Sequence, residues 1–111
     1  MKKFIALYMA PTAALEEWAK VPQAERKAAE EKMRGEWNAW TKEHGNVVAE
    51  TVALGKTKTV NKDVVSDTKN GMMLYSIVEA ESHEAASKLF AGHPHFGIPG
   101  ATIEVMEVRP M

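Results

Sequence analysis

Two segments of this chain are apolar at almost every position, which restricts the folds that it can adopt. Residues 3–9 and 72–80 carry apolar side chains on both of the faces that alternate along an extended strand. On these faces lie Phe4, Ala6 and Tyr8 against Ile5, Leu7 and Met9, and Met73, Tyr75 and Ile77 against Leu74, Val78 and Ala80. A strand of this kind must be covered on both sides. The sequence therefore predicts two central strands in a sheet that has material packed on each face.

Helix and turn signals place the other elements around these strands. Thr12 is expected to cap a short helix, and Pro22 suits the first turn of a longer one that runs to about His44. The predicted order is a strand over 3–9, two helical segments, a strand over 47–54, a polar hairpin inserted within 55–71, a strand over 72–80, a helix capped by Ser82, and a strand over 102–108. This order is the split βαβ pattern of ferredoxin-like α+β folds.

The predicted fold leaves one face of its sheet without helices. Both helical layers of such a domain pack on the same face. The opposite face is apolar here, and an exposed apolar patch of that size is unfavourable in a monomer. We therefore expect a homodimer in which the sheets of two copies pack face to face as a dimeric α+β barrel.

Size and composition exclude several classes of protein. A length of 111 residues fits one domain over residues 1–111. No stretch approaches the roughly 20 apolar residues of a membrane span. The net charge of -1 gives no basic field for nucleic acid or anionic membranes. The absence of cysteine suits a reducing compartment, and the cytoplasm is the expected location.

Two phrases in the C-terminal half resemble a known family. They are Tyr75-Ser76-Ile77-Val78-Glu79-Ala80-Glu81-Ser82, followed by a helix, and Ile103-Glu104-Val105-Met106-Glu107-Val108-Arg109-Pro110. With the order of elements, they resemble the YCII-related family, in particular its DGPF-like branch. The resemblance implies a dimeric α+β barrel, and most members of that family lack an assigned reaction.

The sequence departs from this family at two motifs. Where the branch carries Asp-Gly-Pro-Phe and then Glu-Thr-Lys, this chain has Val64-Val65-Ser66-Asp67-Thr68-Lys69, so only Thr68 and Lys69 match. Other YCII-like proteins place a histidine just after the first strand, within reach of an acidic partner. Here that stretch is Met9-Ala10-Pro11. The resemblance therefore transfers no His/Asp catalytic pair.

The predicted topology gathers three loops at one end of the sheet: the exit of the first strand, the insertion over 55–71, and the loop over 92–100. Polar groups that converge on loops held by a rigid sheet often mark function. The polar and aromatic residues collected at this end are Lys56, Asp67, Lys69, Asn70, His93, His95 and Phe96.

The phrase His93-Pro94-His95 puts two imidazoles in a loop stiffened by proline. Imidazoles titrate near neutral pH, so they could serve as general acid and base, with Asp67 orienting one of them. The same histidines could equally cap helix carbonyls, and an aspartate in a hairpin is more often a turn residue. A metal site is less favoured, because no third His or Cys is near in the sequence.

Polar strand residues and the tryptophans also have two interpretations each. Polar groups at strand positions could line a pocket, although exposure on edge strands explains the acidic ones as simply. These positions are Tyr8, Glu50, Ser76 and Glu104. Helical spacing favours core packing over an aromatic cage for the tryptophans, with Trp18 as a candidate pocket wall. The apolar stripe of the long helix comprises Ala29, Met33, Trp37 and Trp40.

These observations predict a dimeric barrel that binds a small, partly apolar organic molecule at the loop end. The candidate catalytic residues are His93, His95 and Asp67, and the candidate ligand contacts are Tyr8, Trp18, Lys56, Lys69, Asn70 and Phe96. Nucleotide, serine-hydrolase and zinc-protease motifs are absent, so no cofactor or metal is implied. An enzyme of this type would run cofactor-free proton transfer, lyase or hydrolytic chemistry through a histidine. The alternative is a non-catalytic binding or protein-interaction module.

Overall fold

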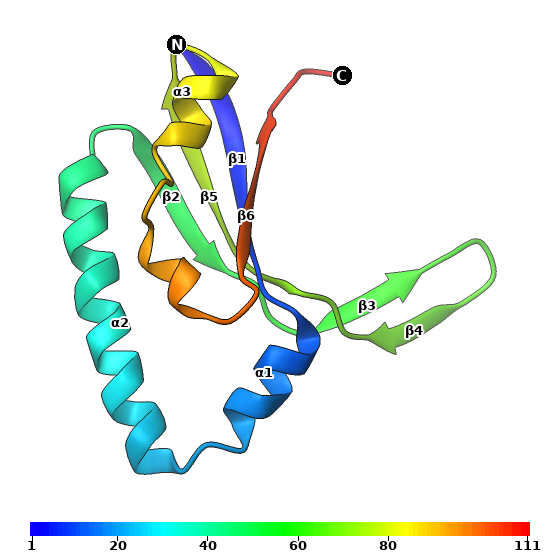
Figure 1. Ribbon diagram of the computed structural model, residues 1–111. Coiled ribbons are helices and arrows are strands. Elements are labelled where there is room, and N and C mark those ends of the chain that lie inside the picture. Colours follow the sequence, from blue (N-terminus) through cyan, green and yellow to red (C-terminus); the bar gives the residue numbers. More distant parts are fainter.

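A four-stranded antiparallel sheet forms the centre of the computed structural model, which describes residues 1–111 (Figure 1). The elements follow in the order β1 (Lys2–Met9), α1 (Thr12–Ala19), α2 (Gln23–His44), β2 (Val48–Ala53), β3 (Thr57–Val60), β4 (Val65–Thr68), β5 (Met72–Ala80), α3 (His83–Lys88), the 3-10 helix η1 (Pro94–Gly97) and β6 (Thr102–Glu107). This architecture confirms the predicted α+β fold with ferredoxin-like topology and a hairpin insertion.

The two segments that are apolar on both faces form the centre of the sheet. The strand order is β2-β5-β1-β6, so β1 and β5 are flanked on both sides. In the antiparallel register Phe4 lies opposite Val78, and Ile5 lies opposite Ile77. β6 pairs with β1 and forms one edge of the sheet. β2 pairs with β5 and forms the other edge.

One face of the sheet carries the hydrophobic core. Phe4, Ala6 and Tyr8 from β1 are buried there, as are Val78 and Ala80 from β5. The residues that cover them are Trp40 of α2, Ala86 of α3 and Phe90. The C-terminal half of α2 and the segment from α3 to η1 therefore supply the cover of this face (Figure 1).

The other face of the sheet has no helix on it. Its central residues Ile5, Leu7, Tyr75 and Ile77 are only half-buried. On the edge strands of the same face, Glu50 of β2 and Glu104 of β6 are exposed, which confirms the edge-strand interpretation of these two acids. The edge strands also expose Val52 and Met106 on this face, so an apolar centre is bordered by edges that carry both glutamates and apolar side chains.

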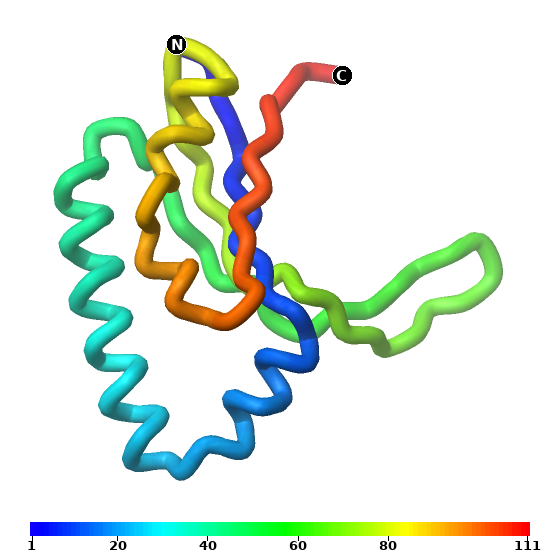
Figure 2. Tube along the Cα trace, in the orientation of Figure 1, coloured from blue at the N-terminus to red at the C-terminus, as the bar shows by residue number.

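The inserted hairpin β3–β4 pairs only with itself and projects away from α2 (Figures 1 and 2). Both chain termini lie at the opposite end of the sheet (Figure 2). The hairpin strands are exposed along their length, apart from the half-buried Thr57.

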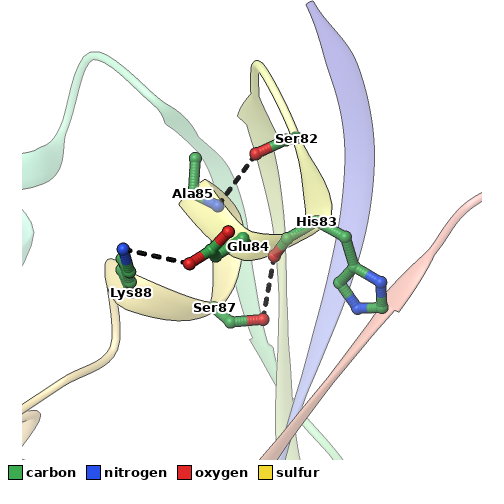
Figure 3. A network of polar contacts seen from close by, with 6 residues as sticks. All are labelled: Ser82, His83, Glu84, Ala85, Ser87 and Lys88. Carbon is green, nitrogen blue, oxygen red and sulfur yellow. Dashed lines mark hydrogen bonds and ion pairs between the residues drawn. The ribbon is translucent and has the colours of Figure 1, made fainter.

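Helix ends follow their predicted caps in one case and not in another. The Ser82 side chain accepts a hydrogen bond from the Ala85 backbone N–H at 3.1 Å, as predicted (Figure 3). An ion pair of 3.1 Å between Lys88 and Glu84 lies on the same helix. Thr12 does not cap α1, because Pro11 occupies the N-cap position and no side chain bonds the helix start.

The first helical layer is less packed than the sequence predicted. No residue of α1 is buried, and Trp18 is exposed rather than part of a core. Along the predicted stripe of α2, Ala29 is exposed, Met33 and Trp37 are half-buried, and Trp40 alone is buried. The stripe is covered only where η1 and α3 reach it. None of the helices combines the length and apolar character that crossing a membrane requires.

Candidate functional site

The three predicted loops do meet at one end of the sheet. The Ala10 backbone N–H donates to the Gly71 carbonyl at 2.8 Å, which ties the end of β1 to the end of the insertion. Gly100 packs against the Pro11 ring and has φ +75°, a conformation that favours glycine. The loop over 92–100 therefore closes onto the same point of the chain.

His93 and His95 are buried in the core at this end of the sheet. Their exposed fractions are 2% and 1%. His93 is the N-cap of η1, and its Nδ1 accepts a hydrogen bond from the His95 backbone N–H at 2.9 Å. Proline at the first position of η1 fits this geometry, because its fixed φ suits a helix start. The sequence signal His93-Pro94-His95 thus forms a capped turn.

Hydrogen-bond directions fix which nitrogen of each neutral ring carries the proton. Nδ1 of His93 is an acceptor, so the proton is on Nε2, which is buried without a partner in the protein. Nε2 of His95 lies 2.9 Å from the Met9 carbonyl oxygen, which can only accept, so Nε2 donates. Nδ1 of His95 then holds a free lone pair and is also buried without a partner. The pair presents one N–H donor and one nitrogen acceptor.

Aromatic rings surround the two imidazoles. The Tyr8 ring centroid lies 5.3 Å from that of His93 and 5.5 Å from that of His95. Trp37 and Trp40 each approach the His93 ring edge-on, with centroids 4.5 Å apart. The Trp40 indole Nε1 is a third buried nitrogen that lacks a partner. We call Tyr8, Trp37, Trp40, His93 and His95 the imidazole cluster.

Both imidazoles are held in the neutral form. Burial, with smaller contributions from the nearby His95 and His44, lowers the pKa of His93 to about 4. Burial also lowers the pKa of His95, although the backbone carbonyls of Met9 and Thr102 oppose this shift. A neutral imidazole at pH 7 can accept a proton through its free nitrogen, which is the state that a general base requires.

A chain of three hydroxyl groups extends from the imidazole cluster across the covered face. The Tyr8 hydroxyl lies 2.7 Å from Ser76 Oγ, which lies 2.8 Å from Thr51 Oγ1. Burial raises the pKa of Tyr8, and the Ser76 hydrogen bond partly opposes the shift. Sequence reasoning missed Thr51. Its cross-strand pairing with Ser76 is the signal that could have identified it.

Asp67 is not brought to the histidines. It is exposed on β4, and its carboxylate bonds the Lys58 ammonium at 2.6 Å. The hairpin that carries it projects away from α2, whereas the histidines pack against α2 (Figure 1). The predicted orienting pair between Asp67 and a histidine is therefore corrected: the carboxylate belongs to a cross-strand ion pair.

The remaining predicted contacts are spread over the loop end. The Asn70 side chain accepts from the Met72 backbone N–H at 2.9 Å, as a turn residue does. Phe96 is exposed, with its ring 6.4 Å from that of His95, and Trp18 does not reach the imidazole cluster. Lys56 and Lys69 line an open cleft of about 780 Å³ at the hairpin. Of the predicted residues, only Tyr8, His93, His95 and Phe96 lie together.

Comparisons with known proteins bear on the fold. No protein-family model matches the chain, and no curated protein does. Among solved structures, the chain is similar to 5-chloro-2-hydroxyhydroquinone dehydrochlorinase from Burkholderia phenoliruptrix AC1100 in complex with 2,5-dihydroxybenzoquinone. The identity is 15%, the match covers 96% of this chain and 93% of that chain, and the TM-score is 0.51. At this identity the likeness supports the fold and nothing finer.

Proposed function

We propose that the protein binds a small, partly apolar organic molecule at the imidazole cluster, with His93 and His95 as its polar contacts. The observation that carries the proposal is the pair of buried neutral rings with one unpaired donor and one unpaired acceptor, enclosed by aromatic side chains. Buried polar atoms are almost always paired in folded proteins. A ligand group that accepts from His93 Nε2 and donates to His95 Nδ1 would satisfy both.

The same pattern defines the class of ligand. Among the titratable side chains, only neutral histidines and a tyrosine lie in the imidazole cluster, so it offers no countercharge for a strongly anionic or cationic group. The aromatic rings favour a planar partner. We infer a neutral, hydroxylated ring. The ligand of the similar dehydrochlorinase structure, 2,5-dihydroxybenzoquinone, is also a six-membered ring, which supports a ring compound as the first probe.

As an enzyme, the protein would perform proton transfer without a cofactor. The O–H bond of a ligand hydroxyl would break as an N–H bond forms at His95 Nδ1, and the resulting oxyanion would accept a hydrogen bond from His93 Nε2. Burial makes the imidazolium product costly, so the step suits transient rather than permanent charge. Tyr8 would position the rings through its contacts with both.

The proposal also takes the protein as a cytoplasmic, YCII-related homodimer whose copies meet through the uncovered sheet face. The likeness of fold and the two quoted strand phrases support the family. Half-buried Ile5, Leu7, Tyr75 and Ile77 support the dimer, because they leave an apolar centre bare in one copy.

Titration with hydroquinone, followed by NMR of the ¹⁵N-labelled histidine rings, tests the site. We expect shifts at Nδ1 of His95 and Nε2 of His93, and at least tenfold weaker binding to the His95→Gln variant. Benzoate, a charged ring of similar size, should bind more weakly than hydroquinone. The matched control is His83→Gln, which removes an exposed histidine whose ring bonds the Val105 carbonyl. Equal affinity of all three proteins for hydroquinone would reject the site.

A non-catalytic role is the second candidate, and one observation favours it. His93 accepts a hydrogen bond from the His95 backbone, and His95 donates one to the Met9 carbonyl. Both bonds fix the geometry of the loop. In that case the bound ring would remain chemically unchanged, and no exchange of ligand protons would be accelerated. Faster hydrogen–deuterium exchange at ring positions of the bound probe, lost in His95→Gln, would instead establish acid/base catalysis.

A further inference from the structure

We propose that the β3–β4 hairpin is an arm that packs on a second copy of this chain. The proposal rests on the sheet-face homodimer proposed above and adds a second area of contact to it. It also gives a role to the segment that the imidazole cluster does not use.

The hairpin has no partner within its own chain. Its two strands pair with each other, and no other strand extends them into a larger sheet. An isolated two-stranded hairpin is at best marginally stable in water and requires a packing surface. The chain therefore holds an extended element that its own core does not support.

The register of the hairpin gives it two unlike faces. Cross-strand partners share a face, so Val60 lies beside Val65, and Lys58 beside Asp67, on one side. The other side carries only threonine and serine: Thr57, Thr59, Ser66 and Thr68. Val60 and Val65 have exposed fractions of 73% and 59%. These two exposed valines lie side by side and give the tip of the arm a small apolar surface.

Charge complementarity identifies a second copy as the partner. The insertion carries four lysines against two aspartates: Lys56, Lys58, Lys62 and Lys69 against Asp63 and Asp67. The uncovered sheet face carries three glutamates and one lysine at its periphery: Glu50, Glu79, Glu104 and Lys3. A basic arm and an acidic rim around an apolar centre are self-complementary, as a two-fold interface requires.

The direction of the arm suits this partner. The hairpin projects away from α2, whose side of the sheet is already covered (Figure 1). The open cleft of about 780 Å³ is lined by Gly55–Lys58 and Asp67–Lys69, with three lysines and no apolar residue. The glutamates at the sheet edge of a second copy would pair with the lysines of this cleft.

Zero-length cross-linking with a carbodiimide tests the contact, because this reagent joins lysine to carboxylate groups in direct contact. Mixed dimers of ¹⁴N and ¹⁵N chains distinguish links between copies from links within one copy. We expect links between a hairpin lysine of one copy and Glu50, Glu79 or Glu104 of the other. A dimer that gives links only within single copies would assign the arm to a different partner and overturn the proposal.

A matched pair of variants provides the second test. Val60→Ser with Val65→Ser should raise the dimer dissociation constant at least tenfold by analytical ultracentrifugation. Thr59→Ala with Ser66→Ala, on the opposite side of the same hairpin, should change it less than twofold. A dimer equally stable in both variants would reject the arm while leaving the sheet-face dimer intact. A wild-type chain that stays monomeric would overturn both proposals.

Discussion

The two faces of the central sheet have similar amino acids and different surroundings. Along β1, Phe4 and Tyr8 are buried completely, whereas Ile5 and Leu7, which alternate with them, are half-buried. The difference lies in the cover, because α2, α3 and η1 all pack on the first face. The sequence pattern of β1 requires that both faces of the strand be covered. A single chain covers only one of them.

The comparison also separates two kinds of polar group. On the covered face, hydroxyl and imidazole groups are buried and held in fixed hydrogen bonds. On the uncovered face, the charged groups Lys3, Glu50, Glu79 and Glu104 are exposed. Our two proposals accordingly place ligand binding on the covered face and contact with a second copy on the uncovered one. Four experiments test this difference between the two faces.

The largest effect is expected from neighbouring substitutions on opposite faces. Phe4→Ala should lower the free energy of unfolding by about 3–5 kcal/mol, because it leaves a cavity in the core. Ile5→Ala should cost less, and its cost should grow with protein concentration if a second copy covers that side. Urea unfolding at two protein concentrations measures both. Equal, concentration-independent losses would mean that the faces do not differ.

Acid should destabilise the covered face through the buried histidines. The unfolded chain binds protons near pH 6.5 and folded His93 only near 4, so protonation favours unfolding between these values. Stability is complete above pH 6.5 and falls as the pH drops, by about 2 kcal/mol for His93 between pH 6.5 and about 5.

The lowered pKa of His95 adds to the same slope. Urea midpoints measured across this range should therefore depend less on pH in His93→Gln and His95→Gln than in the wild type. A wild-type midpoint that stays flat from pH 6.5 to 5 would contradict the burial of both rings.

Removal of one hydroxyl from each face should give a smaller contrast. Tyr8→Phe breaks the bond to Ser76 inside the core and should cost about 1–2 kcal/mol. Tyr75→Phe, on the uncovered face, should stay within about 0.5 kcal/mol. Thermal unfolding under identical conditions compares the stability losses of the two variants. A larger loss for Tyr75→Phe than for Tyr8→Phe would contradict a buried Tyr8 hydrogen bond.

The smallest effect concerns a helix that covers the first face. Ser82→Ala removes the cap of α3 and should cost about 1 kcal/mol. Because α3 does not touch the uncovered face, the variant should leave the oligomeric state unchanged. Calorimetry with parallel sedimentation measures both properties, and a lost dimer would show that the two faces are coupled.

Much of the fold was predictable from local patterns. Unbroken apolar runs identified β1 and β5, and Ser82 identified the start of α3, because both signals arise from neighbouring residues. The packing of α1 was not predictable in the same way. Trp18 has the helical spacing of a core residue, yet no element lies close enough to bury it. Cover depends on distant segments, which periodicity does not report.

The sequence indicated which histidines form the candidate site, but not their burial or their hydrogen-bond partners. The unusual spacing of His93 and His95 singled them out, and topology placed them at the correct end of the sheet. Their burial was missed, because loops rich in proline and glycine are usually exposed. The pairing of Asp67 was missed because it depends on the hairpin register, which sets Lys58 opposite it.

Gly71 lies between β4 and β5, and its carbonyl accepts a hydrogen bond from the Ala10 backbone N–H just after β1. A Cβ at this position would collide with the Ala10 carbonyl oxygen, so the close approach of the two backbones requires glycine. The hairpin is joined to the sheet through β2 and β5, and this contact fixes its base beside the end of β1. Met9, whose carbonyl accepts a hydrogen bond from His95, directly precedes Ala10, which bonds Gly71. The base of the hairpin and the histidine loop therefore share one short stretch of backbone, and a side chain introduced at residue 71 would disturb both.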